Sequence, residues 1–294
     1  MKRSARFLAV FCLTAALLAG TAFADFGPKS QLTVQVVNGP EEPYYLDLLA
    51  EGELGGGWEG PSWDVEQAME RGEIDLELME ALCAAVPEGW HACAAQGTGG
   101  APIYGGLTGE DGVHTFGYHG VPKVYRVLIV TKSGEVWVSE TCQRYVLQTT
   151  ITMDWAAKTV KLPPLWGLYI MQILCTLLPT LLIEGLLLLL FRLNWRANWK
   201  PFLFVNLVTQ GLLSVFLSVT SLQNGVNVMY LILFVPAELA VAFVEAAAYR
   251  KVLKGCTKRR AFFYGLTANA VSAAAGWFLM EPLWQWTTRV VTMP

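Results

Sequence analysis

Long apolar runs dominate the second half of the chain. Four of them, residues 165–191, 202–222, 228–249 and 262–284, each contain 20 residues or more. A helix rises about 1.5 Å per residue, so each run is long enough to cross the roughly 30 Å hydrocarbon core of a bilayer. The pattern predicts an α-helical bundle of four transmembrane helices in residues 164–294.

The first half of the chain has a different pattern. Residues 32–37 and 44–48 alternate apolar with polar or β-branched side chains, and Asn38-Gly39-Pro40 separates them, which predicts two paired strands. Further strands are predicted at residues 124–131, 135–140, 146–153 and 159–162. Together these predict a small all-β, sandwich-like domain of antiparallel strands in residues 25–163.

Helical spacing interrupts this β pattern between residues 62 and 86. Apolar side chains recur there at three- and four-residue intervals, after Ser62 or Asp64 as a helix cap. We expect a helical insertion that lies over one edge of a sheet.

The N-terminus has the three parts of a secretory signal. Lys2, Arg3 and Arg6 precede the apolar run 7–20, and Ala22-Phe23-Ala24 has the small residues of a cleavage site. We predict a signal peptide over residues 1–24, with an uncleaved anchor as the alternative. In both cases the β-rich domain is extracytoplasmic.

Charge supports the same topology. The connections between the first and second runs and between the third and fourth runs carry nine Lys and Arg and no acid, whereas residues 223–227 carry no charge. Because basic loops stay in the cytoplasm, the positive-inside rule places both basic connections there. The sequence therefore predicts a multi-pass plasma membrane protein whose N-terminal domain lies outside.

The 294-residue chain has a net charge of −3 that hides a strong asymmetry. Residues 25–163 contain 20 Asp and Glu against 8 Lys and Arg, and residues 41–88 alone contain 14 acids and one base, Arg71. Such a surface lacks the clustered cations that nucleic acids require, which excludes nucleic-acid binding. It could attract cationic peptides, although a solvated acidic face is the commoner meaning.

Polar side chains interrupt all four predicted spans at similar depth. Placing a polar side chain in the hydrocarbon core is unfavourable in free energy unless the side chain has a hydrogen-bond or charge partner or contacts water. The candidate intramembrane site consists of Glu184, Asn206, Thr209, Gln210, Glu238, Glu245, Asn269 and Ser272. No Lys, Arg or His lies at that depth, so a proton, Na⁺ or divalent metal would have to neutralise the glutamates. Glu184 and Glu238 are the strongest candidates, because Glu245 could instead reach Arg250 near the inner surface.

The alternative explanation for these residues is structural: small and polar side chains only help membrane helices to pack. Against it, the two helical hairpins resemble each other. Glu184 precedes Asn206-x-x-Thr209 by 22 residues, and Glu245 precedes Asn269-x-x-Ser272 by 24 residues. The similarity predicts a parallel tandem repeat, as in transporters that build a site at the repeat interface.

The histidines and half of the cysteines lie in the predicted outer domain. Cys83 and Cys93 are candidates for a disulfide on the oxidising side of the membrane, with unlinked thiols as the alternative, and Cys142 would be left over. The spacings match no compact metal motif, so the metal and any cofactor stay unassigned. No motif of a hydrolase, metalloprotease or nucleotide-binding enzyme occurs, which argues against an enzyme.

The membrane half resembles uncharacterised multi-pass membrane proteins of Gram-positive gut bacteria that carry a secreted N-terminal domain. The resemblance rests on residues 182–184, 205–210 and 268–272, and on Glu238, Glu245 and Tyr249. It implies bacterial cell-envelope localisation and the same topology, and it assigns no activity.

Two functions follow as hypotheses. In the first, the polar core binds a cation or small solute and the outer domain is accessory. In the second, the protein is a noncatalytic envelope receptor or scaffold that binds an envelope protein or peptide and is anchored in the lipid bilayer by its helices.

Overall fold

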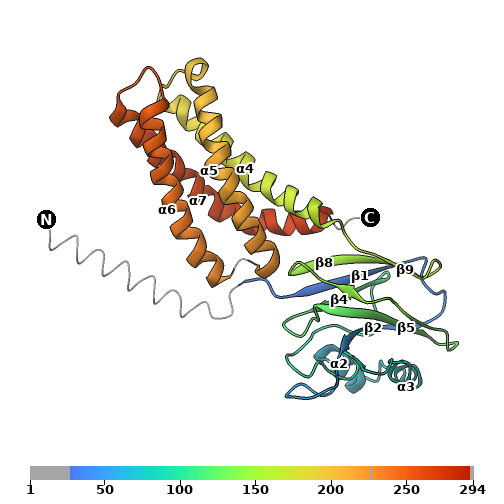
Figure 1. The fold of residues 1–294 in the computed structure, drawn as a ribbon. Helices are drawn as coiled ribbons and strands as arrows, with labels where there is room; N and C mark the ends of the chain where they lie inside the picture. Colours follow the sequence, from blue (N-terminus) through green and yellow to red (C-terminus); the bar gives the residue numbers. More distant parts are fainter. Residues whose placement is uncertain (1–26, 226, 292–294) are drawn as a thin grey trace. The chain divides into compact units, whose positions relative to one another are not determined.

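A computed structural model describes residues 27–225 and 227–291. The predicted signal peptide lies outside the described residues. Clustering of contacts separates two compact units, one containing Lys29–Leu168 and the other Tyr169–Trp284. The broad prediction of a β-rich domain followed by helices is confirmed (Figure 1).

The N-terminal unit contains two sheets. The first has the strand order β4 (Val113–Gly117), β1 (Gln31–Val37), β8 (Gln148–Asp154) and β9 (Thr159–Lys161). The second has the order β3 (Trp90–Ala92), β2 (Tyr44–Glu51), β5 (Val124–Thr131) and β6 (Val136–Val138), and β7 (Cys142–Gln143) also pairs with β5. Buried side chains of both sheets form one hydrophobic cluster, so the unit is a sandwich.

Strand pairing differs from the prediction in two ways. The strands predicted to pair with each other, β1 and β2, lie in different sheets. β1 pairs in parallel with β8, over Gln31–Gln148 to Val37–Asp154, so the first sheet is mixed rather than antiparallel. Alternation in sequence specifies which side chains face the core but not which strand is the partner.

The helical insertion forms two helices, α2 (Trp63–Glu70) and α3 (Leu76–Ala84). Of the two predicted caps, Ser62 and Asp64, the structure shows Ser62 as the cap of α2, where its side chain accepts a hydrogen bond from the Val65 N–H. α3 packs against β2 and β5, the central strands of the second sheet, rather than over a sheet edge. This explains why most residues of β2 and β5 are buried on both faces, while β1 and β8 alternate.

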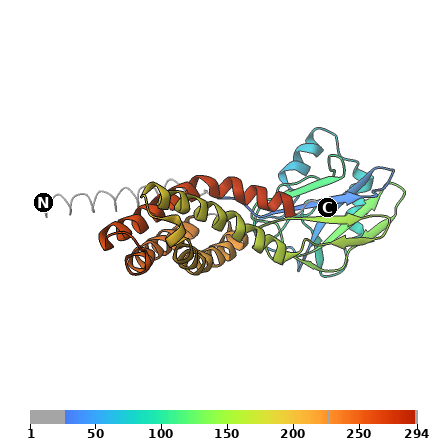
Figure 2. The ribbon, with the colours of Figure 1, turned by 90° about the horizontal axis from the view of Figure 1, so that it is seen from above.

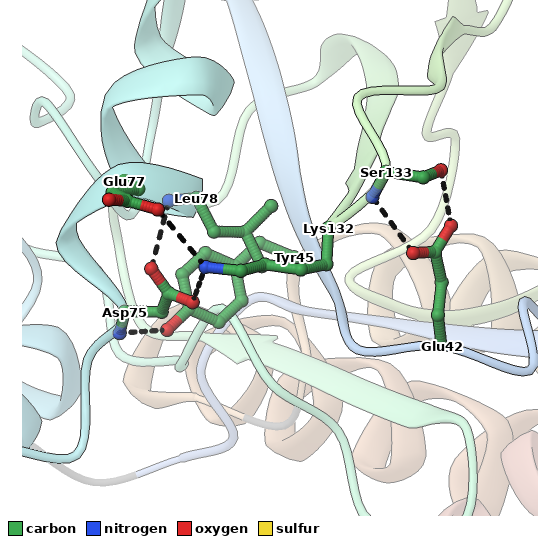
Figure 3. A network of polar contacts seen from close by, with 7 residues as sticks. All are labelled: Glu42, Tyr45, Asp75, Glu77, Leu78, Lys132 and Ser133. Atoms are coloured by element: carbon green, nitrogen blue, oxygen red, sulfur yellow. Dashed lines mark hydrogen bonds and ion pairs between the residues drawn. The ribbon is translucent and has the colours of Figure 1, made fainter.

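A polar network fixes α3 to the second sheet (Figure 3). Asp75 caps α3 by accepting from the Leu78 N–H at 3.2 Å, and its own N–H donates to the Tyr45 hydroxyl at 2.7 Å. Lys132, in the β5–β6 turn, forms an ion pair with Asp75. This ion pair lowers the pKa of the Asp75 carboxyl, chiefly through the hydrogen bond from Lys132.

A buried carboxylate joins β2 to the segment after β3. Asp47 is fully buried and accepts hydrogen bonds from the N–H groups of Leu48, Ala94 and Ala95 at 2.7–3.0 Å. Burial nevertheless raises the pKa of Asp47 to about 7, because the hydrogen bonds only partly offset the loss of water.

The helical unit contains α5 (Trp195–Asn224), α6 (Val228–Val252) and most of α4 (Leu165–Leu190) and α7 (Lys258–Val291). The four helices pack side by side (Figures 1 and 2). Among the described residues, α4, α5 and α6 are long and apolar enough to span a membrane. The fourth predicted span, residues 262–284, lies within α7, which is not among them. The span within α7 contains Asn269 and Ser272, which lower its hydropathy.

The two basic connections of the helical unit are tied together. Asn198, near the start of α5, accepts from the Lys254 N–H at 2.8 Å and donates to the Lys254 carbonyl at 3.0 Å. The Arg260 guanidinium donates to the carbonyl of Phe191 at the end of α4. The ends of the two helical hairpins are thus held at one level.

Candidate functional site

Glu184 is one of two fully buried glutamates in the helical unit, with 0% of its surface exposed. Its Oε1 accepts a hydrogen bond from the Ser272 hydroxyl on α7 at 3.1 Å, while Oε2 has no hydrogen-bond partner among the described residues. The Tyr264 hydroxyl donates to the Glu184 backbone carbonyl at 3.1 Å. α7 therefore holds α4 at the level of this carboxyl.

Glu245 is the second, also with 0% exposed surface. Thr209 on α5 contacts its Oε1, and the Asn269 amide on α7 donates to its Oε2 at 2.8 Å. Asn269 in turn accepts from Gln210 at 3.2 Å. The structure thus places Glu245 inside the bundle, and the alternative in which it reaches Arg250 is not seen.

Asn206 lies beside these two groups on α5. Its amide nitrogen donates to the Tyr249 hydroxyl at 2.5 Å and to the Phe202 carbonyl at 3.2 Å, and its Oδ1 has no hydrogen-bond partner among the described residues. Two buried oxygens, on Asn206 and Glu184, are therefore left without a donor, which is costly in an apolar interior.

Glu238 lies apart from this network and lines a cavity of about 70 Å³. All four helices contribute to the cavity wall, with polar side chains from Thr176 and Thr180 on α4, Gln210 and Ser214 on α5, Tyr230 on α6 and Ser272 on α7. Gln210 and Ser272 belong to the network as well, so the cavity adjoins the buried glutamates. Glu238 is close enough to Glu245 to interact with it electrostatically.

Close helix packing at Gly265 allows α7 to approach the glutamates. A Cβ atom on Gly265 would lie 2.7 Å from the Cα of Ala246 on α6, so only glycine fits without a shift of the backbone. Asn269 is one helical turn farther along the same face of α7. The small residue thus positions the amide that binds Glu245.

The sequence named Tyr249 beside Glu238 and Glu245 but did not include it in the candidate site, and it did not identify Tyr230 or Tyr264. Tyr249 follows Glu245 by four positions, so its place on the same helix face was readable from the spacing. Tyr264 binds a backbone carbonyl of α4, and no sequence signal identifies such a partner. Tyr230 lines the cavity because α6 faces α5 there, which depends on tertiary packing.

The outer unit contains no comparable centre among residues 29–168. His114 is buried and its Nε2 lies 3.3 Å from the Tyr44 hydroxyl, and burial lowers the pKa of this imidazole to about 4. Cys83 and Cys93 are both thiols in the structure, so the predicted disulfide is not formed. Both side chains pack in the apolar core, which raises the pKa of each thiol.

No group of three His, Cys, Asp or Glu side chains that could hold a metal ion occurs in residues 27–225 and 227–291. Comparison with known proteins found no matching family model, no similar curated protein and no similar solved structure. The resemblance to gut bacterial membrane proteins stays a prediction.

Proposed function

We propose that the helical unit is an integral membrane module that binds a small cation in the cavity beside Glu238. The observation that carries this proposal is the composition of the cavity wall. Among the lining residues described, Glu238 provides the one carboxyl group. The other polar side chains of the wall are hydroxyl and amide groups, and the described lining contains no Lys, Arg or His. A carboxylate in such surroundings needs a cation or a proton as its counter-charge.

The size of the cavity fits this ligand. A volume of about 70 Å³ exceeds the roughly 15 Å³ that one water molecule needs, so an ion with a few waters can be accommodated. Carboxylate, amide carbonyl and water oxygens are the ligands that suit hard cations. A divalent metal is less suitable, because the described carboxylates form no three-ligand group.

Protons on Glu184 and Glu245 belong to the same proposal. The Ser272 hydroxyl has one proton but lies within hydrogen-bond distance of two acceptors, Oε1 of Glu184 and the Asn269 carbonyl, both at 3.1 Å. Thr209 is shared in the same way between Glu245 and the Val205 carbonyl. A proton on each carboxyl supplies the missing donor in both places.

The proposed topology has four spans, with α7 as the fourth, and an extracytoplasmic β-rich unit. α7 is long enough at 34 residues, and its first turn contains Lys258, Arg259 and Arg260. These bases and the Arg250–Lys251 pair at the end of α6 flank one connection, which favours a cytoplasmic location.

Calorimetry of the full chain in phosphatidylcholine nanodiscs tests the cation site. NaCl, KCl and methylammonium chloride would be titrated at pH 5.5–8.5 into a choline chloride buffer. At least one of the three cations should give saturable, pH-dependent heat that Glu238→Gln abolishes.

Two threonines provide a matched control, because each hydroxyl donates to its own i−4 carbonyl. Thr180→Val in the cavity wall should weaken binding several-fold, whereas Thr220→Val on an exposed part of α5 should leave it unchanged. If Glu238→Gln binds as the wild type does, the proposed site is wrong. If a folded chain binds none of the three cations, the receptor or scaffold hypothesis replaces it.

A further inference from the structure

A groove of about 700 Å³ lies on the outer unit, between the loop before α2 and the loops after β3. Three large aromatic side chains line it and are half exposed: Trp58 at 50%, Trp63 at 58% and Tyr104 at 44%. Burial of an aromatic side chain stabilises a protein strongly, because the ring has a large apolar surface. Three such side chains left exposed on one concave surface therefore indicate a binding site.

The loop that presents Trp58 is held rigidly by glycines. The Trp58 carbonyl accepts from the N–H groups of Thr98 and Gly99 at 3.2 and 3.1 Å. A Cβ on Gly97 would lie 2.5 Å from the Trp58 carbonyl oxygen, and Gly97 has a φ of +116°. The Gly-rich segments therefore position the Trp58 ring at the groove.

The opposite wall is equally well supported. Ser62 donates to the Gly105 carbonyl at 2.7 Å, and Asp64 accepts from the Gly105 N–H at 2.5 Å. Tyr104 directly precedes Gly105 in the chain and packs edge-on against Tyr118, with ring centroids 5.1 Å apart. Tyr118 has a φ of 81°, a conformation that is unfavourable for an aromatic residue and that recurs at functional sites.

Charge indicates what the groove binds. Its ionisable wall residues are Glu59, Glu66 and two tyrosines, and no Lys, Arg or His is among the described lining residues. Residues 41–88, the stretch of chain that supplies both carboxylates and both tryptophans of the groove, contain 14 acids and one base. Aromatic faces beside carboxylates attract Lys and Arg side chains, through the ring quadrupole and the negative charge together. Lys29 illustrates this chemistry, since its Nζ lies 5.9 Å from the Tyr118 ring centroid.

We propose that this groove binds an extended basic peptide segment of a partner protein, with Arg or Lys side chains held between the Trp58, Trp63 and Tyr104 rings and the Glu59 and Glu66 carboxylates. The volume of the groove, about 700 Å³, and its open side suit a chain segment rather than a single small amine. The proposal is independent of the cation site in the helical unit, because every residue that it uses belongs to the outer unit.

The test is fluorescence anisotropy with the full chain in phosphatidylcholine nanodiscs. The probe is a fluorescein-labelled (Gly-Arg)₄ peptide, and its neutral counterpart replaces each Arg by citrulline. The Arg peptide should bind saturably and the citrulline peptide at least tenfold more weakly. Trp58→Ala should weaken Arg-peptide binding at least tenfold, and Trp63→Ala provides a second variant on exposed helix surface if Trp58→Ala does not fold.

A charge-matched pair separates a groove from a merely acidic surface. Glu59→Gln/Glu66→Gln should weaken binding at least tenfold, whereas Glu80→Gln/Glu88→Gln, which removes the same charge elsewhere on the unit, should change it less than twofold. Equal losses in both pairs would overturn the proposal, as would binding that survives both tryptophan variants. Chitotetraose is added as a competitor, and Trp58-dependent binding of this sugar without binding of the Arg peptide would also overturn it.

Discussion

The Ser272 hydroxyl on α7 lies 3.1 Å from Oε1 of Glu184 on α4, and the Thr209 hydroxyl on α5 contacts Oε1 of Glu245 on α6. Each glutamate therefore takes its hydroxyl partner from the other helical hairpin. Both hydroxyl residues end an Asn-x-x-Ser/Thr motif. This reciprocal exchange is what two interlocked halves of a tandem repeat would produce, and it supports the proposed duplication.

The two glutamates differ in the number of hydrogen-bond partners that remain when the hydroxyl group is removed. Ser272→Ala leaves Glu184 without its hydroxyl partner, while Thr209→Val leaves Glu245 with the Asn269 amide. We expect Ser272→Ala to destabilise the helical unit by about 1–3 kcal/mol and Thr209→Val by less. Thermal unfolding in detergent micelles measures both, with the exposed Thr220→Val as control. The reverse order would contradict the assigned network.

Gly265 should tolerate no side chain. Gly265→Ala places a methyl group 2.7 Å from the Ala246 Cα, so α7 must move away from α6 at a cost of about 1–3 kcal/mol. Gly211→Ala on α5 is the matched control, because a Cβ there has nothing within 4 Å. The unfolding midpoint should fall for Gly265→Ala alone. Equal midpoints would show that the two helices do not pack as closely as described.

The hydrophobic pattern predicted the kind and extent of most elements but few of their partners. Residues 124–131 and 228–249 were located almost to their ends, because strand and helix periods are local properties of sequence. The pairing of β1 with β8 was not predictable, since an alternating strand can pair with any other alternating strand. β3 was missed because three residues carry too little periodicity.

In the candidate site, too, the sequence predicted the positions of side chains but not their partners. Spacing of four residues placed polar side chains on single helix faces, and depth placed them in one layer. Which side chain binds which depends on helix packing, so Glu184 with Ser272 could not be derived, and Glu245 was ranked below Glu238 although it is the more deeply buried. The groove was missed because only the fold brings its aromatic residues together: Trp58 lies in the loop before α2, Trp63 at the start of α2 and Tyr104 in the segment after β3.

His114 should make the sandwich sensitive to mild acid. Burial lowers the pKa of His114 to about 4 in the folded state, below the usual value of 6.5, so the unfolded chain binds more protons between these values. Stability is therefore full above about pH 6.5 and falls toward pH 4, by up to about 3 kcal/mol at 1.4 kcal/mol per pKa unit. Amide hydrogen exchange in β1 and β4 measures it. His114→Phe should remove this pH dependence, and an unchanged slope would assign it to another group.

Asp47 should give the stability of the sandwich the opposite pH dependence. Its pKa of about 7 lies above the usual 3.8, so the folded chain binds more protons between these values. This contribution is full below about pH 4 and is lost as the pH rises through 7. Asp47→Asn should flatten the slope of exchange in β2 and lower stability at every pH, because an amide cannot accept all three N–H donors. A variant that retains the wild-type slope would contradict the shifted pKa.

Cys256 reports the orientation of the helices. It lies in the connection between α6 and α7, beside Lys254 and Lys258, which the positive-inside rule places in the cytoplasm. A membrane-impermeant maleimide should therefore label Cys256 only after cells are permeabilised. Glu88→Cys, on an exposed turn of the outer unit, should be labelled in intact cells, and peptide mass spectrometry distinguishes the two sites. Labelling of Cys256 in intact cells together with protection of Glu88→Cys would reverse the topology, and it would place the peptide groove in the cytoplasm, where its basic partner would have to be sought.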